Sequence, residues 1–150
     1  MKVINSNPRI GIRAILQEVK KEKLTITDVV FIIAPRINAA GRMKHGIHAV
    51  NLLTENDLEK AKLFASEIEE FNTDRRAADK DITAQALNQI IENNEEERMT
   101  TVVYHETWHK GVIGIGASRL TETYYRPTLV FTKSGDRLAA SARSVTDFDV

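Results

Sequence analysis

The feature that most constrains this chain of 150 residues is the stretch from residue 47 to residue 110, which contains neither proline nor glycine. Between residues 58 and 90, apolar side chains recur every three to four positions, which places them on one face of an α-helix. This apolar stripe is interrupted in the middle by Asn72, Arg75 and Asp79. We predict one helix from about Glu55 to about Asn93, with Thr54 as its N-cap. A helix of that length overshoots a small domain, so we expect a spacer whose two ends pack on different bodies.

Composition excludes several classes of protein. The chain is 42% hydrophobic and 28% charged, as globular proteins are, and its longest wholly apolar run, residues 29–34, is far shorter than a membrane helix requires. No signal-peptide core follows the first two residues, so we expect a soluble, cytoplasmic protein with no membrane partner. The absence of cysteine excludes disulfides, thiolate zinc sites and cysteine nucleophiles.

The net charge of zero hides an uneven distribution. Residues 1–54 carry nine basic and three acidic side chains (+6), residues 55–98 carry six and thirteen (−7), and residues 99–150 carry six and five (+1). A basic first segment suits a polyanionic partner, because local charge steers encounters more than total charge does. An ordinary solvated surface explains the same distribution equally well.

The first third of the chain predicts short helices followed by a loop. The dipeptide Asn7-Pro8 is typical of an N-cap and a first helical position, and the apolar residues after it predict a short amphipathic helix. Residues 26–34 fit either a short helix or a buried strand, and we favour the helix. Pro35 disfavours helical backbone at the residue before it, so residues 36–42 are predicted to form a loop.

Behind the long helix the pattern changes to that of an α/β unit. Residues 100–105 and 126–132 are typical of strands, with a helix from 111 to 125 between them. A turn at 133–136 leads into a third strand that ends at Ser144. The predicted fold class is therefore α/β, with a helical N-terminal piece, a long spacer helix and a partial α/β domain with a mixed sheet. No cap or turn closes this unit, so we expect the chain to be cut from something larger.

One candidate site is the acid-free segment that contains Arg36, Asn38 and Arg42. Guanidinium forks and an asparagine amide are the groups that contact phosphates and base edges in nucleic-acid-binding proteins. A solvated basic loop is the alternative interpretation.

A second candidate site is the glycine-containing segment where a predicted strand leads into a helix, with His109, Lys110, Gly111 and Gly114. Glycines let the backbone approach a ligand, and a helix N-terminus favours an anion such as phosphate. Tight packing of the helix on the sheet explains the same glycines.

A third candidate site is formed by Ser141, Arg143 and Ser144 on the last predicted strand, where two hydroxyls flank a guanidinium as in a phosphate cradle. Outward-facing residues on an edge strand are the alternative. No arrangement of acids and histidines suits two divalent ions, and the only metal-like spacing, His105 with His109, does not share a helix face.

These segments, in this order, resemble the RecJ family of bacterial single-strand-specific 5′-to-3′ DNA exonucleases, which is part of the DHH phosphoesterase superfamily. The resemblance spans nearly the whole chain and is carried by residues 5–14, residues 34–43, Asn72 and Arg75, residues 108–115, residues 117–120 and residues 141–144. The chain departs from the family at Ala140, where glycine usually precedes the serine.

The resemblance implies three parts. Residues 1–54 would be the C-terminal part of a DHH catalytic domain, residues 55–98 the connecting helix, and residues 99–150 the N-terminal part of a DHH-associated substrate-binding domain. The motifs that hold two manganese or magnesium ions would lie outside this chain, so we expect no catalytic residue, metal ligand or cofactor within it. The full-length parent is expected to be a monomeric nuclease of DNA repair and recombination.

The resemblance also implies that single-stranded DNA threads between the two domains. The residues assigned to the DNA path are Arg36, Asn38, Arg42, His109, Lys110, Gly111 and Gly114. The residues assigned to the 5′-phosphate are Ser141, Arg143 and Ser144.

Two other functions stay open at this point. A related DHH phosphoesterase with the same two-domain plan would act on short oligonucleotides or cyclic dinucleotides, although residues 34–43 disfavour it. A non-catalytic interaction module built on the long helix is the second alternative, and oligonucleotide binding by the isolated chain distinguishes it.

We predict that this chain by itself does not degrade DNA, because two-metal cleavage of a phosphodiester needs metal ligands that the sequence lacks. The measurement is incubation of the purified chain with labelled single strands and manganese. Steady, dose-dependent release of nucleotides that traces to no contaminant would contradict this prediction.

Overall fold

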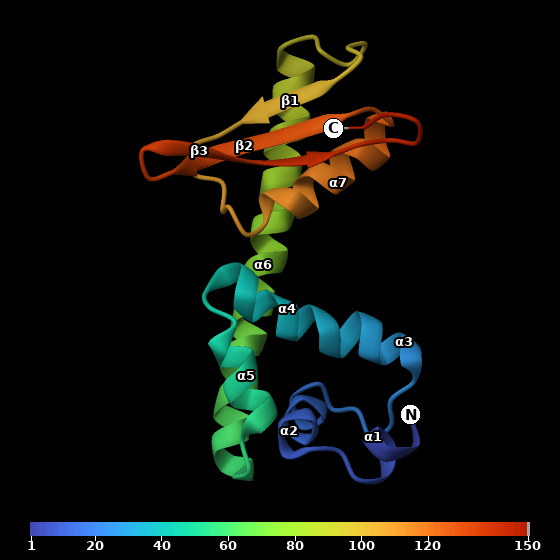
Figure 1. The fold of residues 1–150 in the computed structure, drawn as a ribbon, viewed down its shortest axis with the longest axis vertical. Helices are drawn as coiled ribbons and strands as arrows, with labels where there is room; N and C mark the ends of the chain where they lie inside the picture. The colour runs from blue at the N-terminus through green and yellow to red at the C-terminus, as the bar shows by residue number, and fades with distance from the viewer. Residues whose placement is uncertain (150) are drawn as a thin grey trace. The chain divides into compact units, whose positions relative to one another are not determined.

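The computed structural model describes residues 1–149, which form two compact units divided within the longest helix, between Arg75 and Arg76. The helical elements are α1 (Lys2–Ser6), α2 (Ile10–Glu18), α3 (Ile26–Asp28), the π-helical turn Val29–Ile33, α4 (Ala34–Met43), α5 (Ile47–Thr54), α6 (Leu58–Glu92) and α7 (Ile113–Tyr124) (Figure 1). The strands are β1 (Thr101–Tyr104), β2 (Thr128–Ser134) and β3 (Arg137–Arg143). The predicted α/β fold class is confirmed, whereas the assignment of the three parts to named domains stays a prediction.

Helix α6 has 35 residues and confirms the predicted long helix. The prediction of Thr54 as its N-cap is wrong, because Thr54 ends α5 and its hydroxyl donates to the Val50 carbonyl at 2.8 Å. Asp57 takes the capping role, its Oδ1 accepting a hydrogen bond from the backbone N–H of Lys60 at 2.9 Å. Among the described residues, no helix is apolar over enough of its length to cross a membrane, α6 included.

The predicted loop at residues 36–42 is wrong, because the chain continues there as helix α4. In a regular α-helix a proline removes one hydrogen bond, and its ring collides with the carbonyl four residues earlier. Here the turn before α4 is π-helical, and Pro35 lies in the first turn of α4, where a missing N–H is tolerated. The helix favoured for residues 26–34 is confirmed in this widened form.

Helix α2 confirms the predicted amphipathic helix, but its N-cap is Arg9, so the predicted capping role of Asn7-Pro8 is wrong. Asn7 instead ends α1, a short helix that the sequence did not indicate. The apolar face of α2 joins those of α4, α5 and the first half of α6 in one core. The core residues include Ala14, Ile15, Ala39, Ala40, Leu52, Ala61 and Ile68.

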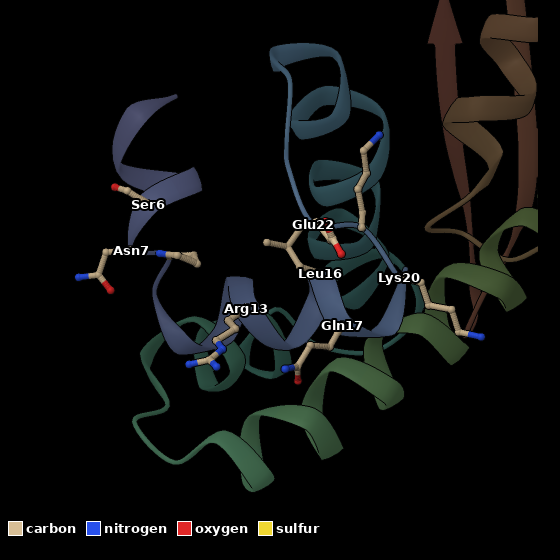
Figure 2. A pocket seen from close by; sticks show the side chains of 9 residues that line it. Ser6, Asn7, Arg13, Leu16, Gln17, Lys20 and Glu22 are labelled. Atoms are coloured by element: carbon tan, nitrogen blue, oxygen red, sulfur yellow. The ribbon is translucent and has the colours of Figure 1, made fainter.

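A cleft opens beside α2, lined by the segment that connects α1 to α2 and by the turn that follows α2. Arg13 and Gln17 extend from the same face of α2, and Lys20 lies beyond the end of the helix (Figure 2). All three side chains are exposed, and the cleft contains none of the predicted site residues. We therefore assign no ligand to it.

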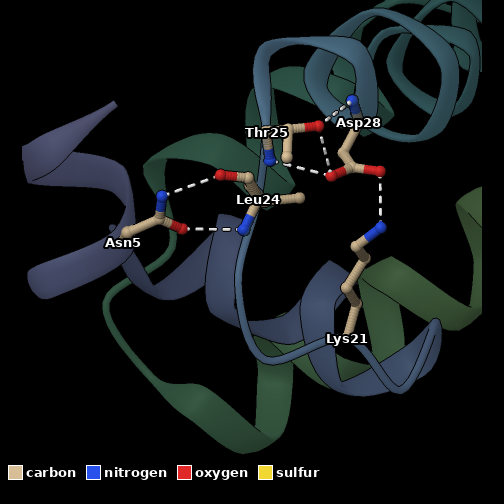
Figure 3. A network of polar contacts seen from close by, with 5 residues as sticks. All are labelled: Asn5, Lys21, Leu24, Thr25 and Asp28. Carbon is tan, nitrogen blue, oxygen red and sulfur yellow. Dashed lines mark hydrogen bonds and ion pairs between the residues drawn. The ribbon is translucent and has the colours of Figure 1, made fainter.

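A polar network ties α1 to the start of α3 (Figure 3). The Asn5 side chain donates to the Leu24 carbonyl and accepts from the Leu24 N–H, both at 2.8 Å. Thr25 and Asp28 form a reciprocal capping box at the N-terminus of α3, and Lys21 donates to Asp28 at 2.5 Å. The hydrogen bonds from Lys21 and Thr25 lower the pKa of the Asp28 carboxyl from 3.8 to about 2.

The second unit contains a mixed sheet with strand order β1-β2-β3. Strands β1 and β2 are parallel and connected through α7, whereas β2 and β3 form an antiparallel hairpin whose turn has Gly135 at a φ of 62°. The predicted strand, helix, strand, strand order is confirmed. Val103 and Val130 are buried on one face of the sheet, where Ser141 lies opposite Val130. The other face exposes Val102 and Leu138.

We predict that Asp28→Asn destabilises the first unit at neutral pH, because it removes the carboxylate that accepts from Thr25 and Lys21. Since the pKa of Asp28 is lower in the folded state, its contribution is present above about pH 4 and is lost as the pH falls towards about 2. Urea unfolding followed by circular dichroism should therefore show a difference between variant and wild type that closes over this range.

The matched control is Asp74→Asn, because Asp74 is an exposed acid on α6. A difference between Asp28→Asn and wild type that stays constant from pH 7 to pH 2 would show that the carboxylate charge contributes nothing.

Candidate nucleic-acid interface

The guanidinium of Arg143 is the centre of a cluster formed by β3 and α7. Ser141 and Arg143 are two residues apart on β3 and therefore project from the same face of the sheet. Arg143 Nε donates to Ser118 Oγ on α7 at 3.1 Å, and Arg143 Nη1 approaches Ser141 Oγ at 3.4 Å and donates to the Ala142 carbonyl at 2.7 Å. Two hydroxyls and one guanidinium thus converge from two elements.

The backbone of α7 comes close to this cluster at Gly114. A Cβ atom added at Gly114 would lie 3.0 Å from Ser141 Oγ and 3.4 Å from Arg143 Nη2, so a larger residue would displace the side chains of β3. Ser118, one turn further along α7, donates its hydroxyl to the Gly114 carbonyl at 3.1 Å. Gly114 thus permits close packing of α7 on β3, which is the alternative explanation for this glycine, whereas its approach to a ligand stays a prediction. We call Gly114, Ser118, Ser141 and Arg143 the α7–β3 cradle.

The electrostatics of the cradle favour an anion. Arg143 has no acidic partner within ion-pair distance among residues 1–149, and its Nη2 donates to no acceptor in that part of the chain. Gly114 lies in the first turn of α7, where the helix dipole contributes partial positive charge. A guanidinium with an unused N–H beside two hydroxyls is suited to a phosphate group.

Ser144 does not join this cradle in the structure. It follows the last residue of β3, and its hydroxyl donates to the Phe148 carbonyl. His109 and Lys110 lie in the segment before α7, where His109 Nδ1 accepts from the Gly111 N–H at 3.1 Å and Lys110 is exposed. These residues border the N-terminus of α7 and do not contact Arg143.

The predicted DNA-path residues of the first unit, Arg36, Asn38 and Arg42, lie on two faces of α4. Asn38 and Arg42 are four residues apart on α4, so they share one face, and both are exposed. Arg36 lies elsewhere on the helix, where it forms an ion pair with Glu69 of α6 and donates to the Ile32 carbonyl at 2.8 Å. The Arg36 Nε and Glu69 Oε2 atoms are both buried. The structure therefore groups Asn38 with Arg42 and gives Arg36 a partner inside the protein.

Comparison with known proteins identifies the relatives of this chain, although no family model matches it. It is 38% identical over 144 residues to the single-stranded-DNA-specific exonuclease RecJ of Dickeya dadantii (strain 3937) and 35% identical over 144 residues to that of Escherichia coli (strain K12). Each alignment covers 91% of this chain and 25% of the relative. The fold agrees with a crystal structure of RecJ in complex with Mg²⁺ from Thermus thermophilus, with a TM-score of 0.84 and 27% identity over 97% of this chain.

The chain belongs to the RecJ family. It spans about a quarter of the length of the curated RecJ relatives that it matches, and 22% of the Thermus thermophilus RecJ chain in the Mg²⁺ complex. A further crystal structure, of exonuclease RecJ bound to manganese, also has a TM-score of 0.84, with 28% identity, and this chain covers 36% of it.

Crystal structures of RecJ contain Mg²⁺ or Mn²⁺, so we tested whether this part of a RecJ protein fits such ions. Among residues 1–149, no three acidic or histidine side chains lie close enough together to hold a metal ion. His105 stacks on Trp108 at a ring distance of 5.8 Å and contacts Thr107, and His109 bonds to the backbone of its own loop. The residues described do not fit the metal centre.

Ser118 is the cradle residue that the sequence analysis did not select. The segment 117–120 contributed to the resemblance to RecJ, but no separate role was assigned to its serine. The sequence does contain one indication of this role: Ser118 is four residues after Gly114, and residues four apart on a helix lie on one face. That face turns towards β3.

We predict that Arg36 and Arg42 differ in their contribution to DNA binding. Arg42→Ala should lower the slope of log affinity against log salt by roughly 0.7 on single strands, the loss of one phosphate contact. Arg36→Ala should leave the slope unchanged and destabilise the first unit instead, because it leaves the buried Oε2 atom of Glu69 without its partner.

Fluorescence titration of single strands at several salt concentrations, with thermal unfolding of each variant, measures both effects. The interpretation of α4 is wrong if Arg36→Ala lowers the slope as much as Arg42→Ala does while leaving the unfolding temperature unchanged.

Proposed function

We propose that this chain is part of a single-stranded-DNA-specific 5′-to-3′ exonuclease, in which it supplies residues of the DNA path and of the binding site for the 5′-phosphate. The observation that carries the proposal is the α7–β3 cradle, where Arg143 has two hydroxyls beside it and no acidic partner among the described residues. The family relatives, which are named as single-stranded-DNA-specific exonucleases, support the choice of substrate.

The chemistry of the cradle favours the end of a strand over its interior. A terminal phosphate carries more negative charge than an internal phosphodiester and offers three unsubstituted oxygens. Arg143 can donate to it through Nη2, and the hydroxyls of Ser118 and Ser141 can reorient towards further oxygens. Each charge-assisted hydrogen bond contributes about 1.5 to 3 kcal/mol in net terms. An internal phosphodiester has two of its four oxygens esterified and meets the same groups less well.

The DNA path needs contacts that do not depend on base identity. Asn38 and Arg42 offer an amide and a guanidinium on one exposed face of α4, which suits phosphate and sugar contacts. His109 and Lys110 border the N-terminus of α7 in the other unit and provide a second set. We assign Arg36 to the fold of the first unit because its charge is paired with Glu69.

The bond-breaking step is assigned to the rest of the full-length protein. The described residues do not fit a metal centre, and crystal structures of RecJ are in complex with Mg²⁺ or Mn²⁺. We therefore place the divalent ions, and with them the activation of the attacking water, on residues outside this chain. The role of this chain is to bind the strand and to present its 5′ end.

In the full-length protein, Arg143→Ala should lower kcat/KM on 5′-phosphorylated single strands by roughly one to two orders of magnitude, at about 1.4 kcal/mol per tenfold. The effect on strands with a 5′-hydroxyl should be much smaller, because the interaction that is lost is made to the terminal phosphate. The two substrates should be compared at the same length and sequence.

Arg137→Ala is the matched control, because Arg137 is an exposed arginine at the other end of β3. Equal losses on both substrates would mean that Arg143 serves the general path or the fold, and the assignment to the 5′-phosphate would be withdrawn. A cyclic dinucleotide, which has no 5′ end, should not compete with a 5′-phosphorylated strand for this site.

A further inference from the structure

Helix α7 contacts β3 with one face and α6 with another. Gly114 and Ser118 meet Ser141 and Arg143 of β3, as described above. On the face towards α6, a Cβ atom added at Gly116 would lie 3.1 Å from Ile82 Cγ2, so the two helices are in close contact there. The packing of α7 on α6 therefore contributes to the position of the cradle residues of α7 relative to β3.

That packing includes a two-pronged ion pair. Arg119 Nε and Nη2 donate to the two carboxylate oxygens of Asp79, each at 2.8 Å. A fork of two parallel hydrogen bonds fixes direction as well as distance, which a single contact does not. The pair therefore restricts both rotation of α7 about its axis and sliding of α7 along α6.

Asp79 is unusual among the acids of α6. It is 5% exposed, in the middle of the helix where the apolar stripe is interrupted, whereas the Arg119 side chain that pairs with it is 52% exposed. A buried carboxylate without its cation is strongly unfavourable, so Asp79 holds Arg119 in one arrangement. The hydrogen bonds to Asp79 also raise the pKa of Arg119, which keeps its charge.

We infer that the ion pair between Asp79 and Arg119 is a positioning element for the α7–β3 cradle, and that it sets the preference for a 5′-terminal phosphate by holding Ser118 against Arg143. The inference rests on the proposed function of the cradle. Arg119 directly follows Ser118 in α7, so any rotation that releases the fork also moves the Ser118 hydroxyl. That hydroxyl lies 3.1 Å from Arg143 Nε, and a shift of about 0.5 Å takes the contact out of hydrogen-bond range.

Loss of the ion pair between Asp79 and Arg119 changes the orientation of the Arg143 guanidinium and leaves its charge in place. Without the contact to Ser118, the guanidinium keeps its neighbours on β3, Ser141 and the Ala142 carbonyl, and can turn away from Gly114. Its charge stays in place, so general attraction of DNA is preserved. The directed hydrogen bonds to a terminal phosphate are weakened.

Two variants separate charge from geometry in the full-length protein. Asp79→Asn keeps the size of the side chain and one acceptor oxygen but removes the charge, whereas Arg119→Lys keeps the charge and loses the fork. Asp81→Asn is the matched control, because Asp81 is an exposed acid two positions further along α6. For each variant, kcat and KM are measured on 5′-phosphorylated and 5′-hydroxyl strands, and the unfolding temperature is recorded.

Asp79→Asn should lower the ratio of kcat/KM on the 5′-phosphorylated strand to that on the 5′-hydroxyl strand by roughly tenfold, mainly through KM. Arg119→Lys should lower the same ratio, and Asp81→Asn should leave it unchanged. In an Arg143→Ala background, Asp79→Asn should not change the ratio further, because both substitutions act through the same guanidinium.

Equal losses on the two strands in both Asp79→Asn and Arg119→Lys, with a lower unfolding temperature, would overturn the inference and leave the pair a fold-stabilising contact. A further fall of the ratio in the Arg143→Ala background would also overturn it. The proposed function fails separately, if Arg143→Ala alone affects both strands equally. If Asp79→Asn does not fold, the ratio measured for Arg119→Lys decides.

Discussion

The candidate phosphate site depends on one close approach, that of the first turn of α7 to β3. A Cβ atom at Gly114 would lie 3.0 Å from Ser141 Oγ, so any other residue there would displace the side chains of β3. The same approach brings Ser118 within hydrogen-bond distance of Arg143. A parallel pair of strands connected through a helix, as β1 and β2 are through α7, places that helix against one face of the sheet. Ser141 and Arg143 project from that face, so the fold itself brings the three hydrogen-bonding side chains of the cradle together.

The arginines of the second unit show how burial separates structural from ligand-binding cations. Arg126 is 6% exposed and donates to Thr101 and to the carbonyls of Glu95, Glu96 and Arg98, so each of its three nitrogens donates within the protein. It ties the segment after α6 to the start of the sheet. Arg119 is half exposed and held by Asp79. Arg143 is exposed, with an Nη2 that donates to no acceptor among the described residues.

Much of the fold could be predicted from the sequence because periodicity reports burial directly. The apolar stripe along α6 and the β-branched, apolar runs of β1 and β2 each reflect burial, and the predicted helix and strands are confirmed. The failures concern single residues whose conformation depends on neighbours. Pro35 is accommodated in a helix because a π-helical turn precedes it. Thr54 ends α5, and Asp57 caps the next helix in its place. The residue types alone do not show which of two nearby residues, Thr54 or Asp57, is the N-cap of α6.

The individual residues of the candidate site could be predicted from the sequence, but the contacts between them could not. Gly114, Ser141 and Arg143 were selected separately, for the chemistry that each residue type can perform. The contacts that bring the site residues together join positions that are far apart in the sequence. Ser118 is 25 residues from Arg143, and Asp79 is 40 residues from Arg119. Arg36 and Arg143 look equivalent as sequence, yet only Arg36 has a carboxylate partner in the part of the chain described here. Since an arginine already neutralised inside the fold attracts a phosphate weakly, the tertiary partners of each cation, more than its residue type, determine which arginines can attract a phosphate group.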